Sequence, residues 1–256
     1  NAYVTGSFRG TATFGSFTLT SAGDNDIYIA KYDASGNVVW AQRAGGSSLD
    51  YSNDIAVDRV GSFYLTGYSG NMGTFGSTTF IYSGRGDVFV AKYDASGNVW
   101  ARKQGGFRYD HGRSIAIDAS GNTYLAGSFK PGSYFYGATM LTSAGESDVF
   151  LAKYDASGNM LWVKRAGGTS NDYSFGVVVD GLGNVYVTGS FSGTATFGSF
   201  TLTSGGESDV FLAKYDGSGN VLWAKSAGGA VNEAGYGVAV DGSGNAYVTG
   251  KFSGVA

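Results

Sequence analysis

The chain has 256 residues, a net charge of −3 and only 14% charged residues, with no basic run, which argues against a nucleic-acid partner. It has no cysteine, which excludes disulfides, zinc–thiolate sites and thiol nucleophiles and fits an exported bacterial protein. Glycine reaches 44 residues beside 15% aromatics, so the glycines are expected to be turns between many short strands. No apolar run has the length of a membrane span, and none is predicted.

One unit of about 61 residues is written four times, and the chain opens and closes on the same strand, "NAYVTGSF" at 1–8 and "NAYVTGKF" at 245–252. Periods this long and regular indicate propellers, solenoids or arrays. We predict a single repeat domain over 1–256, with units at about 1–61, 62–121, 122–183 and 184–244 and a partial unit at 245–256. A single catalytic centre is less expected, because any chemistry of the unit is present in every copy.

The third unit predicts four strands, at 173–180, 184–191, 208–216 and 221–229, with an extra hairpin or long loop at 192–207. Four short strands joined by glycine turns are the sequence form of a propeller blade. A β-sandwich or a β-solenoid is the alternative, but a sandwich rarely repeats so faithfully and a solenoid coil is shorter. Strands such as "DVFLAKYD" are apolar on both faces, as in blades that stack on neighbours. We therefore predict an all-β propeller.

Aspartate-led turns follow the strands, as in "DASGN" at 33–37 and "DGSGN" at 216–220. Such turns offer one carboxylate each, whereas a calcium loop needs several oxygen ligands at alternate positions. We predict that each aspartate bonds its own turn backbone and that the glycine takes the left-handed conformation. No metal or other cofactor is predicted.

The order of these motifs, from "GN-x-Y-V-T-G-x-F" through "T-L-T-S" and "D-V-F-L-A-K-Y-D" to the tryptophan and "GG", resembles the bacterial β-propeller repeat called SBBP over essentially the whole chain. The resemblance implies a propeller in a secreted or cell-surface protein. Proteins of this family generally have no assigned activity, so it implies little about a ligand.

A carboxylate follows each "GG" at the same offset, and aromatic residues flank three of the four. These connections join one blade to the next and gather on one face of a propeller, so the acids could converge on a cation, an amine or a sugar. The alternative is that each acid caps its own loop or pairs with a nearby lysine. The candidate ligand-binding residues are Asp50, Tyr51, Asp110, His111, Asp172, Tyr173 and Glu233. The single histidine gives little support for a catalytic triad or zinc site.

A lysine recurs inside an otherwise apolar strand of each unit, and a buried ammonium needs a partner. An aspartate that ends the first strand is the natural partner. We predict structural Lys–Asp pairs, within a blade or between blades, from Lys31, Lys92, Lys153 and Lys214 with Asp58, Asp118, Asp180 and Asp241.

Two further features suggest contacts with other molecules. The rim hairpins at 11–21, 73–83, 132–143 and 194–204 carry Phe, Tyr and Thr, which suit either sugar or subunit contacts or simple packing on the outer strand. The second strand of the unit is present five times and the others four times, so one copy is surplus. That strand could pair with another chain, stay an open edge, or belong to a longer parent.

These observations favour a non-enzymatic, extracellular scaffold or binding module that makes multivalent contacts with glycans or cell-surface proteins, as in adhesion. The alternative is a structural subunit that self-assembles, as an oligomer or a filament, through the surplus strand and rim hairpins. A homo-oligomer or flanking repeats are expected. An enzyme ranks third, because nothing assembles a nucleophile, a base and an oxyanion stabiliser in one place.

Overall fold

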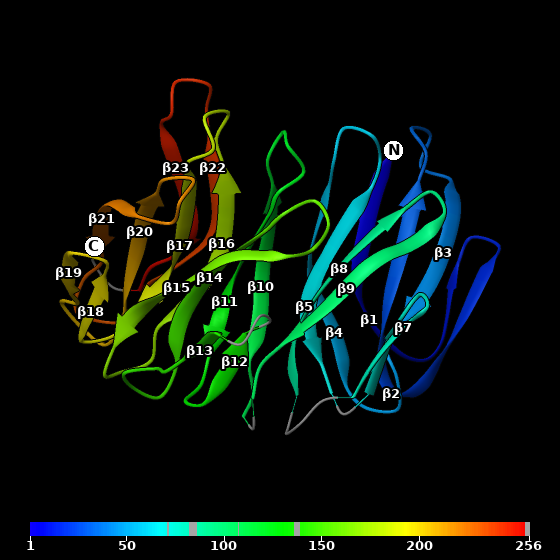
Figure 1. Cartoon of the computed structure of the whole chain (residues 1–256), viewed down its shortest axis with the longest axis horizontal. Helices are drawn as coiled ribbons and strands as arrows, with labels where there is room; N and C mark the ends of the chain where they lie inside the picture. Colours follow the sequence, from blue (N-terminus) through cyan, green and yellow to red (C-terminus); the bar gives the residue numbers. More distant parts are fainter. Residues whose placement is uncertain (71, 82–85, 107, 136–138, 254–256) are drawn as a thin grey trace. The chain divides into compact units, whose positions relative to one another are not determined.

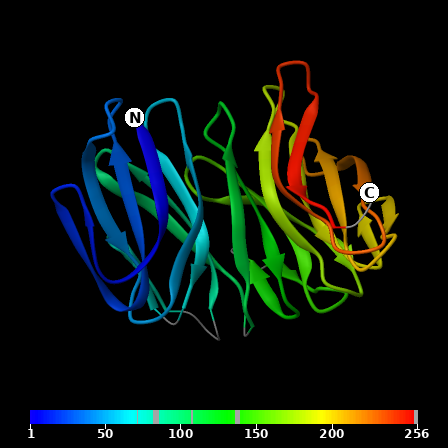
Figure 2. The ribbon, with the colours of Figure 1, turned by 180° about the vertical axis from the view of Figure 1, so that it is seen from behind.

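The computed structural model describes residues 1–70, 72–81, 86–106, 108–135 and 139–253. Every regular element in these ranges is a β-strand, as the sequence predicts (Figures 1 and 2). The chain divides into two compact units, Asn1–Gly112 and Arg113–Ala256. Whether they form the single predicted repeat domain stays a prediction. In the described residues, no helix has the length and apolarity needed to cross a membrane.

Three antiparallel arrays contain all four strands of the repeat, in the sequential order expected for a propeller blade. Neighbouring strands lie side by side in Figure 1. The first array consists of β4 (Asp50–Val57), β5 (Phe63–Ser69), β8 (Asp87–Asp94) and β9 (Gly97–Gln104). The second consists of β10 (His111–Ile117), β11 (Thr123–Phe129), β14 (Asp148–Tyr154) and β15 (Met160–Gly168). The third consists of β16 (Tyr173–Val179), β17 (Val185–Phe191), β20 (Asp209–Tyr215) and β21 (Val221–Ala227), close to the four predicted strands.

Two sheets hold only part of the repeat. The first contains the second, third and fourth strands, as β1 (Ala2–Phe14), β2 (Phe17–Tyr32) and β3 (Val38–Ala44). The other contains the first and second strands, as β22 (Ala234–Val240) and β23 (Ala246–Lys251). Among the described strands, the second strand therefore occurs as β1, β5, β11, β17 and β23, which confirms the predicted surplus copy.

Short hairpins lie between the second and third strands of the complete sheets, as expected for the rim. They are β6 (Met72–Phe75) with β7 (Thr78–Ile81), β12 (Ser133–Phe135) with β13 (Thr139–Leu141), and β18 (Thr194–Phe197) with β19 (Phe200–Thr203). β18 also pairs with the end of β15, so this hairpin extends the preceding sheet. In the first sheet the hairpin is a continuation of β1 and β2, from Thr11 to Thr20.

The core of each unit lies between neighbouring sheets, because the inner strands are apolar on both faces. Every side chain of β5, β11 and β17 is buried. In β14 every residue but Lys153 is buried, which confirms the prediction from its unalternating pattern. In the second unit, Tyr124, Val187 and Phe211 belong to one apolar cluster.

The turns between strands behave as predicted from their sequence. In the turn after β2, Oδ1 of Asp33 accepts the amides of Ser35 (2.8 Å) and Asn37 (2.9 Å). Gly36 has a φ of 82°, in the left-handed region. These hydrogen bonds, first among them that from the Asn37 side chain, hold the pKa of Asp33 below its usual value. The turns are therefore self-contained, without a need for calcium.

Candidate functional site

Each acid that follows a "GG" pair is buried and bonds the backbone of its own loop. Asp50 accepts the amides of Gly46 (2.8 Å) and Gly70 (3.3 Å), together with the hydroxyl of Ser69. In the other copies the equivalent glycine amide also donates to the acid: Gly106 to Asp110 (3.0 Å), Gly168 to Asp172 (2.7 Å) and Gly229 to Glu233 (2.9 Å). This geometry supports the alternative in which each acid caps its own loop. Contact of these acids with a ligand stays a prediction.

A second buried carboxylate, from the start of the third strand, accompanies each loop acid. Among the described residues, its Oδ1 atom has no hydrogen-bond partner in any of the four copies. The sequence showed this aspartate as a repeated strand start but gave no sign that two acids would be buried together. The four copies are Asp26, Asp87, Asp148 and Asp209, and the first three lie beside Asp50, Asp110 and Asp172 respectively. Asp209 follows Ser208, whose hydroxyl donates to the carbonyl oxygen of Glu233 (3.3 Å).

The "GG" pair is required by the atoms that surround it. Gly167 has a φ of 141°, and a Cβ there would lie 2.8 Å from Oδ2 of Asp172 and 2.9 Å from Oδ1 of Asp148. A Cβ on Gly168 would collide with the carbonyl oxygen of Thr194 in the rim hairpin. The first glycine therefore makes room for the acid pair, and the second allows the hairpin backbone to approach.

Burial raises the pKa of Asp50, Asp87, Asp148 and Asp172 above its usual value. The pKa of Asp50 is raised to about 6, mainly by burial, and the nearby charge of Asp26 adds to the effect. The pKa of Asp87 is raised to about 7 by burial and then by Asp110. Burial likewise raises the pKa of Asp172 to about 7. A carboxyl that keeps its proton near neutral pH avoids placing two buried negative charges side by side.

The aromatic candidates of the first unit gather around Tyr68, which the sequence reasoning missed. The ring of Tyr68 lies 6.2 Å from that of Tyr51, 6.0 Å from that of Tyr109 and 5.3 Å from that of His111. The hydroxyl of Tyr51 also accepts a hydrogen bond from Nδ2 of Asn25 (3.1 Å). In the second unit Tyr173 contacts Phe175, with ring centroids 6.4 Å apart. The only available signal for Tyr68 was its place in the second strand, where three of the other copies have serine and the last has Lys251.

The predicted Lys–Asp pair is present for Lys214 and Asp180, and a tyrosine of the second strand contacts both residues. Nζ of Lys214 lies 4.8 Å from the ring centroid of Tyr186, whose hydroxyl donates to Oδ2 of Asp180 (3.3 Å). Nζ of Lys214 itself lies 4.0 Å from Oδ2 of Asp180, at the limit of an ion pair. The lysines are also half-buried rather than fully buried.

The other copies follow the same plan. The lysine-to-ring distances are 5.4 Å for Lys31 and Tyr3, 5.0 Å for Lys92 and Tyr64, and 5.0 Å for Lys153 and Tyr124. The tyrosine hydroxyl donates to the aspartate in three copies: Tyr64 to Asp58 (3.4 Å), Tyr124 to Asp118 (3.1 Å) and Tyr247 to Asp241 (3.1 Å).

The rim hairpins bury part of the aromatic surface that the sequence offered for contacts. Phe75 and Phe197 are fully buried, with ring centroids 4.5 Å from Phe89 and 4.7 Å from Phe211. At the end of β7, Ile81 is 74% exposed. Packing therefore accounts for the phenylalanines, and contacts with sugars or subunits stay a prediction. Residues 82–83 and 136–138 of the predicted hairpins lie outside the described residues.

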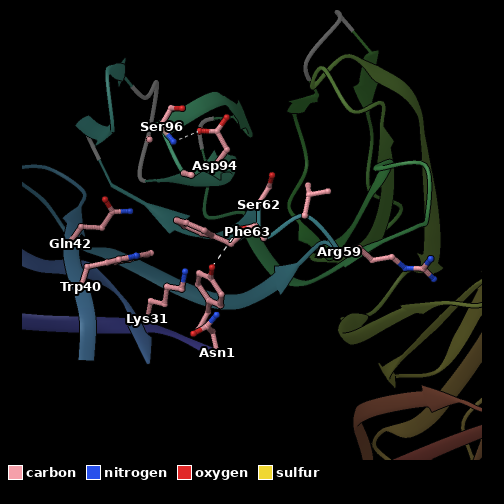
Figure 3. A pocket seen from close by; sticks show the side chains of 14 residues that line it. Asn1, Lys31, Trp40, Gln42, Arg59, Ser62, Phe63, Asp94 and Ser96 are labelled. Carbon is pink, nitrogen blue, oxygen red and sulfur yellow. Dashed lines mark hydrogen bonds between the residues drawn. The ribbon is translucent and has the colours of Figure 1, made fainter. Parts of the chain in front are cut away.

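A cavity of about 920 Å³ lies in the first unit, between the β1–β3 sheet and the β4–β9 sheet. Its lining includes Tyr3. Figure 3 shows other lining residues, among them Lys31, Trp40, Gln42, Phe63 and Asp94. The rings of Tyr3 and Trp40 pack on Phe63, with centroids 5.4 Å and 5.6 Å away. Ligand sites commonly combine aromatic walls with a few polar groups at this volume. We call this space the first-unit cavity. The sequence reasoning did not predict it.

Within the described residues, no three His, Cys, Asp or Glu side chains come together as ligands for a metal ion.

Comparison with known proteins agrees with this architecture. Residues 39–71, 161–190 and 229–251 match the family described as SBBP, Beta-propeller repeat. These three segments carry the SBBP beta-propeller repeat. The first two SBBP matches each run from the fourth strand of one sheet into the first two strands of the next. The third covers β22 and β23, so the surplus strand belongs to a recognisable SBBP segment.

Two curated relatives are similar to the chain at low identity. The "Uncharacterized WD repeat-containing protein L264" of Acanthamoeba polyphaga mimivirus is 26% identical over 99% of this chain and 23% of its own length. The "Regulatory protein FlaEY" of Caulobacter vibrioides is 28% identical over 71% of this chain and 20% of its own length. The chain therefore spans about a fifth to a quarter of the length of these relatives. A crystal structure of a protein of unknown function from Bacteroides caccae is 11% identical, with a TM-score of 0.47 over 95% of this chain and 64% of that one.

Proposed function

We propose that the chain is a non-enzymatic, extracellular binding module whose blades present loops to glycans or cell-surface proteins. Its mechanism is multivalent contact, in which several weak contacts combine into useful avidity. The SBBP repeats support this proposal, because the resemblance implies a secreted or surface protein.

The observation that carries the proposal is that the repeated aspartates form hydrogen bonds within their own blades. Asp172 bonds the amides of Gly168 and Ser192, and Asp180 bonds its own turn and Tyr186. These hydrogen bonds hold the loops and turns of the blades in place. A rigid scaffold with variable loops is the usual arrangement of a binding protein.

A binding experiment with two valencies tests the proposal. The chain would be applied to arrays of glycans and of bacterial surface proteins, once as the free chain and once displayed in several copies on a carrier. We expect signals that are about a hundredfold stronger for the multivalent form. Silence of both forms on both arrays would contradict the proposal.

A second candidate is a structural subunit that self-assembles through β23, because the side chains of this strand are more exposed than those of the equivalent strand β17. Tyr247 and Val248 are 58% and 37% exposed, whereas Tyr186 and Val187 at the same positions of β17 are fully buried. In β17 the neighbouring strand β20 covers this edge, whereas among the described strands β23 pairs with β22 alone. An open strand edge can pair with a strand of another chain.

Sedimentation over a range of concentrations tests the second candidate. We expect assemblies that dissociate in Tyr247→Lys, since a lysine on an edge strand opposes pairing. Tyr236→Lys is the matched control, because Tyr236 is also exposed (52%) but lies on β22. A monomer at every concentration would exclude assembly.

A further inference from the structure

The first-unit cavity exists at a junction that is closed in the second unit. There, Nε1 of Trp162 and Nζ of Lys153 both donate to the carbonyl oxygen of Gly217, at 3.2 Å and 3.1 Å. Gly217 belongs to the turn between the third and fourth strands of the following sheet. That turn also packs on the tryptophan, because a Cβ on Gly219 would lie 3.1 Å from Cδ2 of Trp162. One turn therefore supplies a single oxygen to two donors.

The equivalent donors of the first unit face the cavity instead. Lys31 and Trp40 are cross-strand neighbours, as Lys153 and Trp162 are. Among the described residues, neither Nζ of Lys31 nor Nε1 of Trp40 has a hydrogen-bond partner. The side chain of Gln42, which also lines the cavity, has none either.

The cause is a turn that is one residue shorter. In the other three copies one more residue separates the aspartate from the tryptophan than between Asp94 and Trp100. The tryptophan keeps its place opposite Lys92, so the turn tightens and Asp94 pairs with Gly97. Gly97 has a φ of 119° rather than 80° as in Gly219. A Cβ on Gly97 would meet nothing within 4 Å, so this glycine faces open space where Gly219 packs on Trp162.

Within the described part of the chain, the first-unit cavity has no counterpart of the Gly217 carbonyl oxygen. An acceptor oxygen of a ligand could take that position, between the ammonium of Lys31 and the indole N–H of Trp40. In Figure 3 the side chains of Lys31, Trp40 and Gln42 lie on one side of the cavity and Asp94 and Ser96 on the other. The carboxylate of Asp94 accepts the amide of Ser96 (2.7 Å), and Lys31 brings a positive charge to the opposite side of the cavity. The rings of Trp40 and Phe63 offer an apolar wall for the C–H face of a sugar ring.

We propose that the first-unit cavity binds an acidic sugar, a uronate residue of a glycan, with its carboxylate between Lys31 and Trp40. This inference rests on the proposed function and names its ligand class. A neutral sugar would also reach the aromatic wall, but it would leave the ammonium without a counter-charge. Charge-assisted hydrogen bonds are the stronger ones, so the carboxylate should decide the preference.

Calorimetric titration of the full chain with tetragalacturonate tests the site, with its methyl ester as the uncharged probe. We expect one site per chain and binding that is about tenfold weaker for the ester. Lys31→Met and Trp40→Phe should each weaken binding about tenfold. Lys153→Met and Trp162→Phe are the matched controls, since the Gly217 carbonyl already occupies those donors, and they should change affinity by less than about twofold.

A further variant closes the cavity without changing Lys31 or Trp40. Insertion of one leucine after Val99 restores the turn length of the other copies and should abolish binding, while circular dichroism shows that the chain remains folded. Equal affinity for acid and ester, or unchanged affinity in Lys31→Met and Trp40→Phe, would overturn the site. Binding of a peptide carboxylate in place of the uronate would overturn the glycan class. If the uronate site fails in one of these ways, signals on the arrays would still support the proposed binding function. Silent arrays would contradict both the site and the binding function.

Discussion

Asp148 and Asp172 are buried carboxylates that converge on one glycine, Gly167. Oδ1 of Asp148 has no hydrogen-bond partner among the described residues, and burial raises the pKa of both acids. The same arrangement recurs around Gly45, where Asp26 and Asp50 meet. The stability of the blades should therefore depend on the proton that these pairs retain.

We expect the melting temperature to fall as the pH rises from about 4 to about 8. The folded-state pKa of Asp50 (about 6) and of Asp87 and Asp172 (about 7) lies above the ordinary 3.8, so the folded chain binds more protons in this range. The stabilisation is complete below the ordinary pKa and is lost as the pH passes the raised values. Thermal unfolding at constant ionic strength measures this, and a melting temperature that is flat or rises would contradict it. Asp172→Asn should make the dependence shallower.

Gly167→Ala should destabilise the chain more than Gly183→Ala. Both glycines have positive φ, at 141° and 83°, so each alanine strains the backbone. A Cβ on Gly183 meets nothing within 4 Å, whereas one on Gly167 meets both acids. We expect a loss of about 1 kcal/mol for Gly183→Ala and about 3 kcal/mol or more for Gly167→Ala. Urea unfolding compares the two variants. Equal losses of unfolding free energy would show that the side chains of Asp148 and Asp172 move aside without strain.

Tyr186→Phe should cost about 1 kcal/mol of unfolding free energy, because its hydroxyl is shared by Asp180 and the carbonyl of Gly244. Tyr247→Phe is the matched variant, since Tyr247 bonds Asp241 at 3.1 Å but is 58% exposed. Water can replace that bond, so its effect should stay below about 0.5 kcal/mol. The difference, measured by denaturant unfolding, tests whether the Lys–Tyr–Asp arrangement stabilises only where it is covered.

The leucine insertion after Val99 should also raise thermal stability. The longer turn can place a carbonyl against Nε1 of Trp40 and Nζ of Lys31, as Gly217 does for Trp162. Two regained hydrogen bonds and a filled cavity suggest a gain of about 1–2 kcal/mol. Calorimetry of the unliganded variant measures it, and a lower melting temperature would indicate that the short turn is already optimal.

The sequence predicted the strands well because the repeat marks them several times. The strand predicted at 184–191 is β17 (Val185–Phe191), and the turn at Asp33 bonds itself as expected. The five copies of the second strand were also countable from residues alone. Local patterns of this kind depend on neighbours in the chain, which the sequence states directly.

Contacts between strands were harder to predict. Nothing in the spacing of Lys214 and Asp180 shows that Tyr186 contacts both of them, because that depends on strand order. The burial of Asp50 beside Asp26 was missed for the same reason. The short turn between Asp94 and Trp100 is visible in the sequence, but its effect falls on Trp40 in the preceding sheet.

The turn that covers Trp162 suggests how binding sites could diversify in such chains. A deletion of Leu222 would give this turn the length found between Asp94 and Trp100, and would release the donors of Lys153 and Trp162. One codon lost between two strands would then create a recognition site without any new side chain. Repeats that look identical can thus gain separate ligands through length alone, and engineers could place such sites at chosen junctions.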